Sequence, residues 1–100
     1  MNLLVTGASG FIAQNFIKYS LKRNIKISAI SRKKNKISNK NLKWIVGQFH
    51  EIDLKKIGKF DILIHFASEG TKTNERNNLK KNFEVNVFNS KDLILNAIEN

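Results

Sequence analysis

The stretch from Asn2 to Ala13, NLLVTGASGFIA, decides the fold of this chain. Its first five residues, NLLVT, are mostly apolar and end at a glycine, which predicts a short buried strand over residues 2–6. Apolar residues at positions 12, 16 and 17 then follow helical spacing, which predicts a helix from Phe11 to about Lys22. The chain therefore begins with a strand, a glycine-containing turn and a helix.

Small residues occupy three positions of this turn, in the pattern G-x-x-G-x-x-A. Gly7 permits a tight turn, and Gly10 lets the backbone approach a pyrophosphate at the helix N-terminus, where free N–H groups and the helix dipole favour anions. Ala13 allows the helix to pack closely against the strand. Directly after an apolar strand, the pattern favours nucleotide binding, and an ordinary glycine-rich turn is the alternative.

Apolar segments alternate with polar and helical segments along the rest of the chain. The patterns predict strands over residues 25–30, 42–46 and 60–66, loops over 31–41 and 68–74, one or two helical turns over 51–57, and a helix over about 75–99. The strand over 60–66, FDILIHF, is the most apolar run and is predicted to be buried on both faces. This alternation predicts an α/β fold, a parallel sheet with helices on both faces.

The composition excludes several classes of protein. The 100 residues contain no cysteine, which excludes disulfides, thiolate catalysis and cysteine-bound metals, and with only two histidines no metal site is expected. No apolar run approaches the roughly 20 residues that cross a bilayer, and no basic segment precedes an apolar stretch as in a signal peptide. We therefore expect a cytoplasmic protein with no membrane partner.

The net charge of +10 lies entirely in the first half of the chain, because residues 1–50 contain ten Lys or Arg and no Asp or Glu. A phosphate-bearing partner, a nucleotide or a nucleic acid, suits that half. A nucleic-acid binder would use the basic loop over residues 32–43, but the nearby Trp44 falls in a predicted strand and no recognition helix or RNA-binding motif is present. A nucleotide is therefore the preferred partner, and nucleic acid is not expected.

Three segments resemble motifs of one enzyme family. TGASGFIA, residues 6–13, resembles the TGxxGxxG/A signature of short-chain dehydrogenase/reductases. FDILIHFAS, residues 60–68, and NVFNS, residues 86–90, resemble a strand and a helix of its extended branch, the NAD(P)-dependent epimerases, dehydratases and reductases that act mostly on nucleotide sugars. The resemblance implies a truncated Rossmann-like sheet with strand order 3-2-1-4, so that residues 1–100 form an incomplete NAD(P)-binding domain without a substrate domain.

The resemblance also assigns cofactor roles to matching positions. The pyrophosphate would lie against the turn and the start of the helix, at Gly7, Ser9, Gly10, Phe11 and Ile12. Ser31 and Arg32 fall at the end of the second strand, where relatives that prefer NAD carry an acid that holds the adenosine ribose. A hydroxyl and a guanidinium suit a 2′-phosphate, so we expect a preference for NADP, with NAD as the alternative cofactor and a solvated basic loop as the alternative role of this segment.

Residues further along the chain complete the implied site. Gln48 follows the third strand, where the family usually has an aspartate near the adenine, and its amide oxygen can accept a hydrogen bond from the adenine amino group. Phe66, Ala67 and Ser68 would run beside the ribose on the nicotinamide side. Asn86 would support the active-site geometry, and a solvent-facing helix residue is its alternative role.

The two histidines are not assigned to chemistry. His65 lies inside an apolar strand and is predicted to be packed and structural, and His50 lies in a polar segment with no partner that the sequence reveals.

The catalytic residues of the family have no match in this chain. The family's reaction needs a Ser or Thr on the fifth strand and a Tyr-x-x-x-Lys pair, whereas the single tyrosine, Tyr19, is followed four residues later by Arg23 and lies in the first helix. We therefore expect no catalysis by this chain alone, and a nucleotide-sugar substrate only in a full-length relative. The alternative is a non-catalytic dinucleotide-binding module or partner subunit.

The expected truncation has a consequence for assembly. The fourth strand, residues 60–66, would lie at an exposed apolar edge of the sheet, and such edges recruit further strands. We expect self-association, or binding to a partner chain, through this strand and the C-terminal helix.

Overall fold

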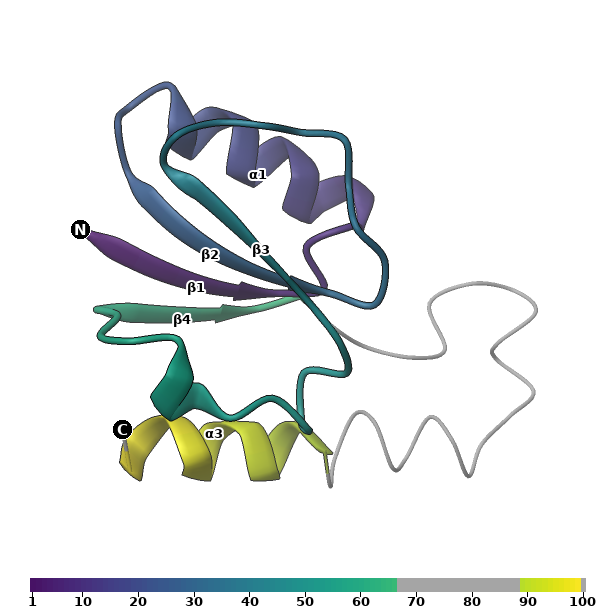
Figure 1. Ribbon diagram of the computed structural model, residues 1–100, viewed down its shortest axis with the longest axis vertical. Coiled ribbons are helices and arrows are strands. Elements are labelled where there is room, and N and C mark those ends of the chain that lie inside the picture. The colour runs from purple at the N-terminus through teal and green to yellow at the C-terminus, as the bar shows by residue number, and fades with distance from the viewer. Residues whose placement is uncertain (67–88, 100) are drawn as a thin grey trace. The chain divides into compact units, whose positions relative to one another are not determined.

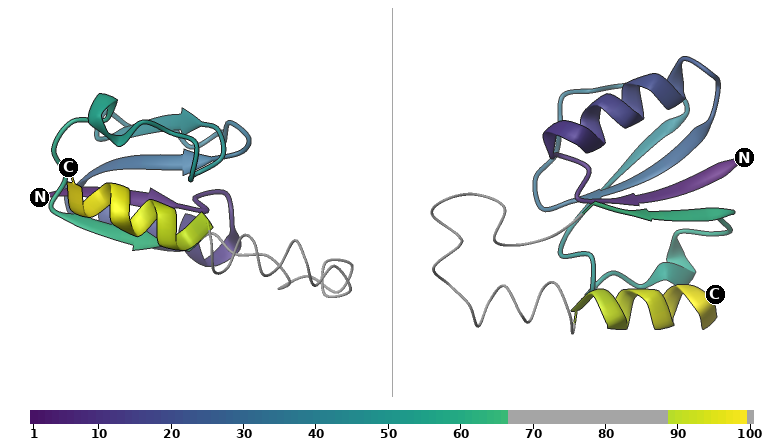
Figure 2. Two further views of the ribbon diagram at one scale, coloured as in Figure 1. Left: turned by 90° about the horizontal axis from the view of Figure 1, so that it is seen from below. Right: turned by 180° about the vertical axis from the view of Figure 1, so that it is seen from behind.

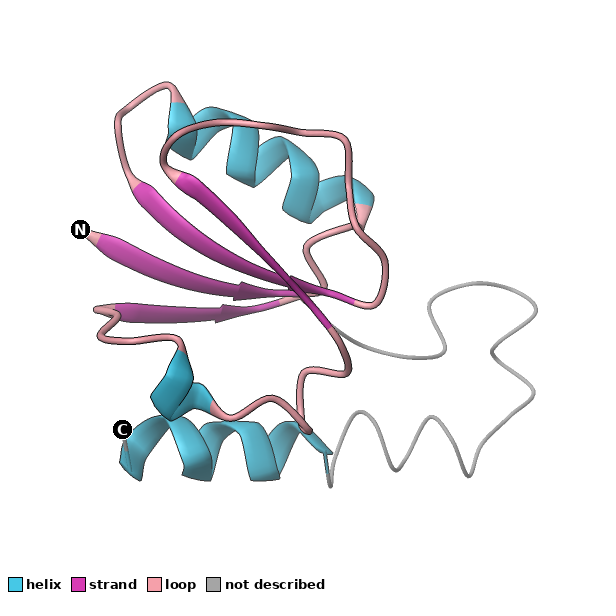
Figure 3. Cartoon of the chain, viewed as in Figure 1, coloured by secondary structure: helices cyan, strands magenta, loops and turns pink. Residues whose placement is uncertain are grey.

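The computed structural model describes residues 1–66 and 89–99. The elements in these ranges are β1 (Asn2–Thr6), α1 (Phe11–Leu21), β2 (Lys26–Ser31), β3 (Leu42–Val46), the 3-10 helix η1 (Leu54–Lys56), β4 (Ile62–His65) and α3 (Ser90–Glu99), as Figures 1 and 3 show. The chain divides into two compact units, Met1–Ala67 and Ser68–Asn100, and each is described by itself.

The four strands of the first unit form one parallel sheet in the order β3-β2-β1-β4. Thr6 near the end of β1 pairs with Ile30 of β2 and with His65 of β4, and Ile30 pairs in turn with Ile45 of β3. The carboxyl ends of all four strands therefore lie at the same edge of the sheet (Figure 1). This arrangement confirms the predicted Rossmann-like sheet and its strand order.

Helix α1 covers one face of this sheet (Figure 2). Its buried apolar side chains are Ala13, Ile17 and Leu21, of which Ile17 and Leu21 share a core with Leu3, Val5, Ile27 and Ala29 of the sheet. Ala13 is only 1% exposed, so a larger side chain at this position would overpack its surroundings. The small residue predicted for the third position of the glycine pattern is therefore required by packing.

The segment after β3 lies on the side of the sheet opposite to α1 (Figures 1 and 2). The ring of Phe49 is buried and contacts the ring of His65 edge-on, with centroids 4.8 Å apart. Within the segment, the Asp53 side chain accepts a hydrogen bond from the backbone N–H of Lys55 at the start of η1. The helical turns predicted over residues 51–57 are thus one short 3-10 helix.

Two strand boundaries differ from the prediction. β2 begins and ends one residue later than residues 25–30, and β4 is shorter than the predicted strand over 60–66. Asp61, directly before β4, makes two hydrogen bonds with Asn2. The Asp61 N–H donates to the Asn2 carbonyl oxygen, and the Asp61 carboxylate accepts from the Asn2 N–H, both at 2.8 Å. Ile62 is exposed and the next three residues are half-buried, so the predicted burial of this strand on both faces is wrong for the structure described.

The second unit is described only over residues 89–99. Helix α3 agrees with the end of the helix predicted over 75–99, while the rest of that helix and the loop predicted over 68–74 lie outside the described residues. Across residues 1–66 and 89–99, no helix has the length and apolar character needed to cross a membrane. The same residues contain no group of three or more acidic or histidine side chains placed to hold a metal ion.

Candidate functional site

The glycine turn between β1 and α1 adopts the conformation that its sequence predicted. Gly7 has a φ of 63°, in the left-handed region that side-chain-bearing residues rarely adopt. The N–H of Gly10 donates to the Gly7 carbonyl oxygen at 3.1 Å, and a Cβ atom on Gly10 would lie only 3.3 Å from that oxygen. Gly7 therefore relieves backbone strain in the turn, and a side chain at Gly10 would require the Gly7 carbonyl to shift by a few tenths of an ångström, before any ligand is considered.

Backbone hydrogen bonds join the segments that follow β1 and β3 to the end of β2 at the carboxyl edge of the sheet. The N–H of Ala8 donates to the carbonyl oxygen of Ile30 at 3.1 Å. The N–H of Gly47 donates to the carbonyl oxygen of Ser31 at 2.9 Å. On the other side of β1, the N–H of Phe66 donates to the Thr6 carbonyl oxygen at 3.2 Å. The predicted site residues within the first 66 positions are thus gathered along one edge.

The N-terminus of α1 opens toward this edge with unsatisfied donors. The first helical bond runs from the N–H of Gln14 to the Gly10 carbonyl oxygen at 2.9 Å, so the N–H groups of residues 11–13 have no acceptor within the helix. No side chain caps this end and no acidic residue lies in the first turn. With the helix dipole, these donors form an environment that favours an anion.

Side chains at the start of α1 fix the turn and leave two large apolar groups exposed. The Gln14 amide donates to the Ser9 carbonyl oxygen at 2.6 Å, which holds the turn against the first helical residues. Phe11 is 83% exposed and Ile12 is 70% exposed, so neither large apolar side chain is used by the core of the first unit. Their exposure beside unsatisfied N–H groups fits contact with a bound molecule.

The end of β2 places Ser31 and Arg32 next to the glycine turn, but in different roles. Ser31 is buried, and its hydroxyl donates to the Lys33 carbonyl oxygen at 2.7 Å and accepts from the Lys33 N–H at 3.2 Å. This side chain therefore shapes the turn that follows β2. Arg32 is exposed at the first position after β2.

The remaining predicted contacts are divided between described and undescribed residues. Gln48 is exposed directly after Gly47, at the edge where Gly47 is bonded to Ser31. The ring of Phe66 packs against that of Phe16 in α1, with centroids 5.8 Å apart, so this side chain belongs in part to the core. Ala67, Ser68 and Asn86 lie outside the described residues.

The rings of both histidines contact Phe49, in the segment that lies on the side of the sheet opposite to α1. A hydrogen bond joins His65 Nδ1 to the hydroxyl of Thr6, and burial lowers the pKa of this imidazole from its usual 6.5. The ring of His50 also meets Phe49 edge-on, its Nε2 lies 3.5 Å from a carboxylate oxygen of Glu51, and its Nδ1 is buried with no hydrogen-bond partner among the described residues. These contacts support the packed role predicted for His65.

The contacts that hold this edge together leave no signal in the sequence. The bonds of Ala8 and Gly47 are made by backbone N–H groups, which carry no signal in the residue types. Tyr19 lies in α1, as predicted, and not at the position of the family's catalytic tyrosine. The guanidinium of Arg23 lies over its ring, 3.6 Å from the ring centroid.

Comparisons with known proteins agree with this geometry. A family model described as "NAD dependent epimerase/dehydratase family" matches residues 3–99. No curated protein sequence matches the chain. Among solved structures, MoeE5 in complex with UDP-glucose and NAD superposes with a TM-score of 0.84 at 20% identity, over 99% of this chain and 33% of MoeE5.

Two further solved structures show the same fold. The UDP-glucuronic acid 4-epimerase from Bacillus cereus in complex with NAD has a TM-score of 0.79 at 20% identity, over 96% of this chain and 35% of its own. A short chain dehydrogenase family protein from Francisella tularensis has a TM-score of 0.76 at 24% identity, over 99% of this chain and 46% of its own. The chain thus spans about a third of the length of MoeE5 and of the Bacillus enzyme.

Proposed function

Because the chain belongs to the NAD dependent epimerase/dehydratase family, we propose that it binds a nicotinamide dinucleotide at the carboxyl edge of its sheet. We propose further that it corresponds to the N-terminal part of an epimerase, dehydratase or reductase that acts on a nucleotide sugar. Support for the substrate class comes from relatives such as MoeE5, which holds UDP-glucose and NAD. When bound, the dinucleotide supplies a nicotinamide ring that exchanges hydride with a substrate.

One observation carries the proposal: the open N-terminus of α1 is held beside the end of β2 by the bond from Ala8 to Ile30. A dinucleotide needs an anion site for its pyrophosphate and, beside it, a strand end for its ribose. The residues present fit this group, because the turn residues Gly7, Ser9 and Gly10 lead directly into the free N–H groups that Phe11 and Ile12 carry.

The preference for NADP is a finer part of the proposal. Arg32 is exposed at the end of β2, where a guanidinium can pair with a 2′-phosphate in two parallel hydrogen bonds. Ser31 acts through its bonds to Lys33, which set the direction in which the chain leaves β2. MoeE5 and the Bacillus enzyme hold NAD, so the preference depends on Arg32 rather than on likeness to them.

The other assigned positions extend the cofactor site. We propose that exposed Gln48 contacts the adenine from the end of β3. Phe66, Ala67 and Ser68 follow the end of β4 and would run beside the second ribose, while Asn86 would support the geometry of the active site. With no Tyr-x-x-x-Lys pair in its 100 residues, the chain by itself is proposed to bind dinucleotide without turnover.

Calorimetric titration of the chain with NADPH and with NADH tests the proposal. We expect NADPH to bind more tightly, and Arg32→Asp to weaken NADPH binding by about tenfold or more, since a charged hydrogen-bonding partner is lost. The matched control is Lys36→Asp, an equal change of charge at an exposed position of the same loop, which should change either affinity by less than about threefold.

The outcomes separate the two levels of the proposal. Equal affinities for the two cofactors, unchanged by Arg32→Asp, would refute the NADP preference and leave dinucleotide binding intact. A folded chain that binds neither cofactor would refute the binding function itself. Tight binding with no turnover of any nucleotide sugar would agree with a separate dinucleotide-binding module as well as with part of an enzyme.

A further inference from the structure

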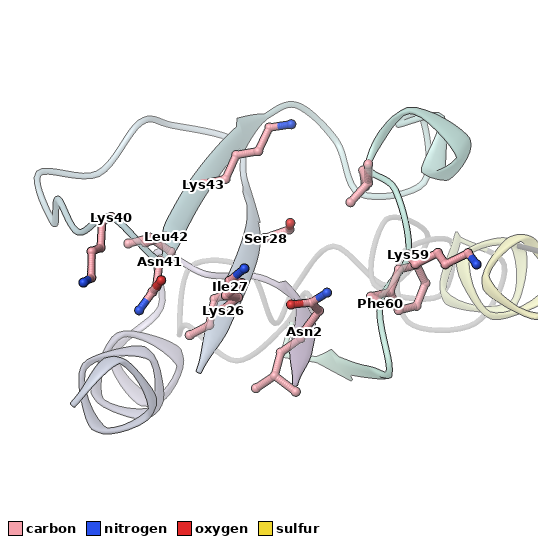
Figure 4. Close-up of a pocket in the computed structure, with 12 residues that line it drawn as sticks. Asn2, Lys26, Ile27, Ser28, Lys40, Asn41, Leu42, Lys43, Lys59 and Phe60 are labelled. Atoms are coloured by element: carbon pink, nitrogen blue, oxygen red, sulfur yellow. The ribbon is translucent and has the colours of Figure 1, made fainter. Parts of the chain in front are cut away.

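The amino-terminal edge of the sheet carries a basic hollow that the proposed cofactor site does not use. A cavity of about 320 Å³ opens there between the starts of β1, β2 and β3 and the segment before β4. Its charged lining residues are Lys26, Lys40, Lys43 and Lys59, and no carboxylate lines it. Figure 4 shows Lys40 and Lys43 on one side of the hollow and Lys59 on the other, with Lys26, Ser28 and Asn2 between them.

Strand register explains why two of these lysines share a surface. Asn2 pairs with Lys26, and Ser28 pairs with Lys43. Side chains alternate along a strand, so Lys26 and Ser28 point to the face opposite the core residue Ile27. Lys26 and Lys43 are therefore diagonal neighbours on one face of two parallel strands, with Cα atoms roughly 8 Å apart for strands ~4.8 Å apart and a rise of ~3.3 Å per residue. The loops before β3 and β4 bring Lys40 and Lys59 to the same hollow.

The charges of this hollow are not compensated within the described structure. All four lysines are exposed, and none forms an ion pair with any residue of 1–66 or 89–99. The carboxylate closest in sequence, Asp61, accepts from the backbone N–H of Asn2 at 2.8 Å. Like charges gathered without a counter-charge repel one another, and a bound anion relieves that repulsion.

We propose that the hollow binds an oligophosphate, a ligand with two or more linked phosphate groups. Ammonium groups are strongly hydrated point charges that suit phosphate oxygens, and their four-carbon chains let them turn toward a ligand. Four lysines line the hollow, and they carry more positive charge than a single phosphate can neutralise. Asn2, Ser28 and Asn41 line the same hollow and add neutral hydrogen-bonding groups. The glycine turn lies at the opposite edge of the sheet, so the two sites are separate.

Titration of the full chain with inorganic triphosphate at low ionic strength tests this site. The double variant Lys26→Gln/Lys43→Gln should weaken binding by about tenfold or more, because two charged partners of the ligand are lost. The matched control, Lys18→Gln/Lys22→Gln, removes the same net charge from exposed positions at or just after the end of α1. It should weaken binding by less than about threefold, because salt largely screens the effect of distant exposed charges on the bound anion. Circular dichroism verifies that both variants are folded.

Three results would overturn the proposal. The first is equal weakening of triphosphate binding in the two double variants, which would show that binding depends on the net charge of the chain and not on this hollow. The second is a loss of triphosphate binding in Arg32→Gln, which would place the anion at the cofactor edge. The third is binding of a single-stranded oligonucleotide by a chain that does not bind triphosphate, which would make the hollow a nucleic-acid surface. Because triphosphate binding does not depend on NADPH, failure of the proposed function would leave this result unchanged.

Discussion

The backbone N–H of Ala8 donates a 3.1 Å hydrogen bond to the carbonyl oxygen of Ile30. This bond joins the glycine turn to β2 one residue before Ser31, and both partners are almost completely buried. A buried hydrogen bond is shielded from competition with water, so it holds the two segments in a fixed relation. The proposed pyrophosphate and ribose positions are therefore aligned by the backbone, and substitutions that move the turn should disturb both.

Replacement of Gly7 by alanine should destabilise the chain by about 1–2 kcal/mol, because a Cβ atom is strained in the left-handed conformation that Gly7 adopts at a φ of 63°. Urea unfolding followed by the fluorescence of the single tryptophan, Trp44, measures this change. Ser9→Ala is the control, since Ser9 lies exposed in the same turn, and its effect should stay within about 0.5 kcal/mol. Equal midpoints for wild type and Gly7→Ala would show that the turn differs in solution.

Ser31→Ala should lower stability by about 1 kcal/mol, because the buried hydroxyl bonds both to the carbonyl oxygen and to the N–H of Lys33. It should also weaken NADPH binding more than NADH binding, since the turn that positions Arg32 is released. Denaturant unfolding and calorimetry give the two quantities. Ser38→Ala, at an exposed position of the same loop, is expected to leave both close to wild type. An unchanged ratio of the two affinities would remove Ser31 from the specificity argument.

Trp44→Phe should loosen the basic loop between β2 and β3. The Trp44 indole N–H donates to the Ile37 carbonyl oxygen at 2.9 Å, and phenylalanine keeps the apolar contact but has no donor. We expect a loss of about 1 kcal/mol in stability, measured by circular dichroism, and faster trypsin cleavage at the lysines of this loop. Tyr19→Phe, at an exposed position of α1, is the control for the loss of one polar group. Cleavage at the wild-type rate in Trp44→Phe would contradict this role.

The free energy of unfolding should fall as the pH is lowered, and part of this fall should come from protonation of His65 in the unfolded chain. Burial lowers the pKa of this imidazole below 6.5, so between the two values the unfolded chain binds a proton that the folded chain does not. The contribution is complete above pH 6.5 and declines as the pH falls toward the lower pKa of the folded state. Urea midpoints measured from pH 8 to pH 5 should therefore decrease less steeply in His65→Gln than in wild type.

His50→Gln provides the comparison for this pH dependence. It replaces the second imidazole that contacts Phe49 and leaves the part-buried His65 in place. The decrease of the urea midpoint with falling pH should therefore be the same in this variant as in wild type. If His50→Gln flattened the profile and His65→Gln did not, the assignment of this pH dependence to His65 would be wrong.

Much of the fold was predictable because its signals are local. The strands over residues 2–6 and 42–46 and the start of the helix at Phe11 agree with the structure, since glycines, apolar runs and helical spacing mark them directly. The ends of β2 and β4 were displaced, because pairing with neighbouring strands determines where a ladder begins, as Asp61 shows by bonding to Asn2. For the same reason the sequence could not show that the Ser31 hydroxyl is bonded to Lys33 or that Phe66 packs on Phe16.

The sequence by itself determined the strand, turn and helix, because Gly7 and Ala13 meet demands of backbone conformation and close packing that act within a few residues. Only the tertiary structure decided which distant groups meet. The bond from Ala8 to Ile30 and the gathering of Lys26 and Lys43 at the opposite edge both depend on the register of parallel strands. That register is a long-range property, because it depends on which side chains neighbouring strands bury together in the folded sheet.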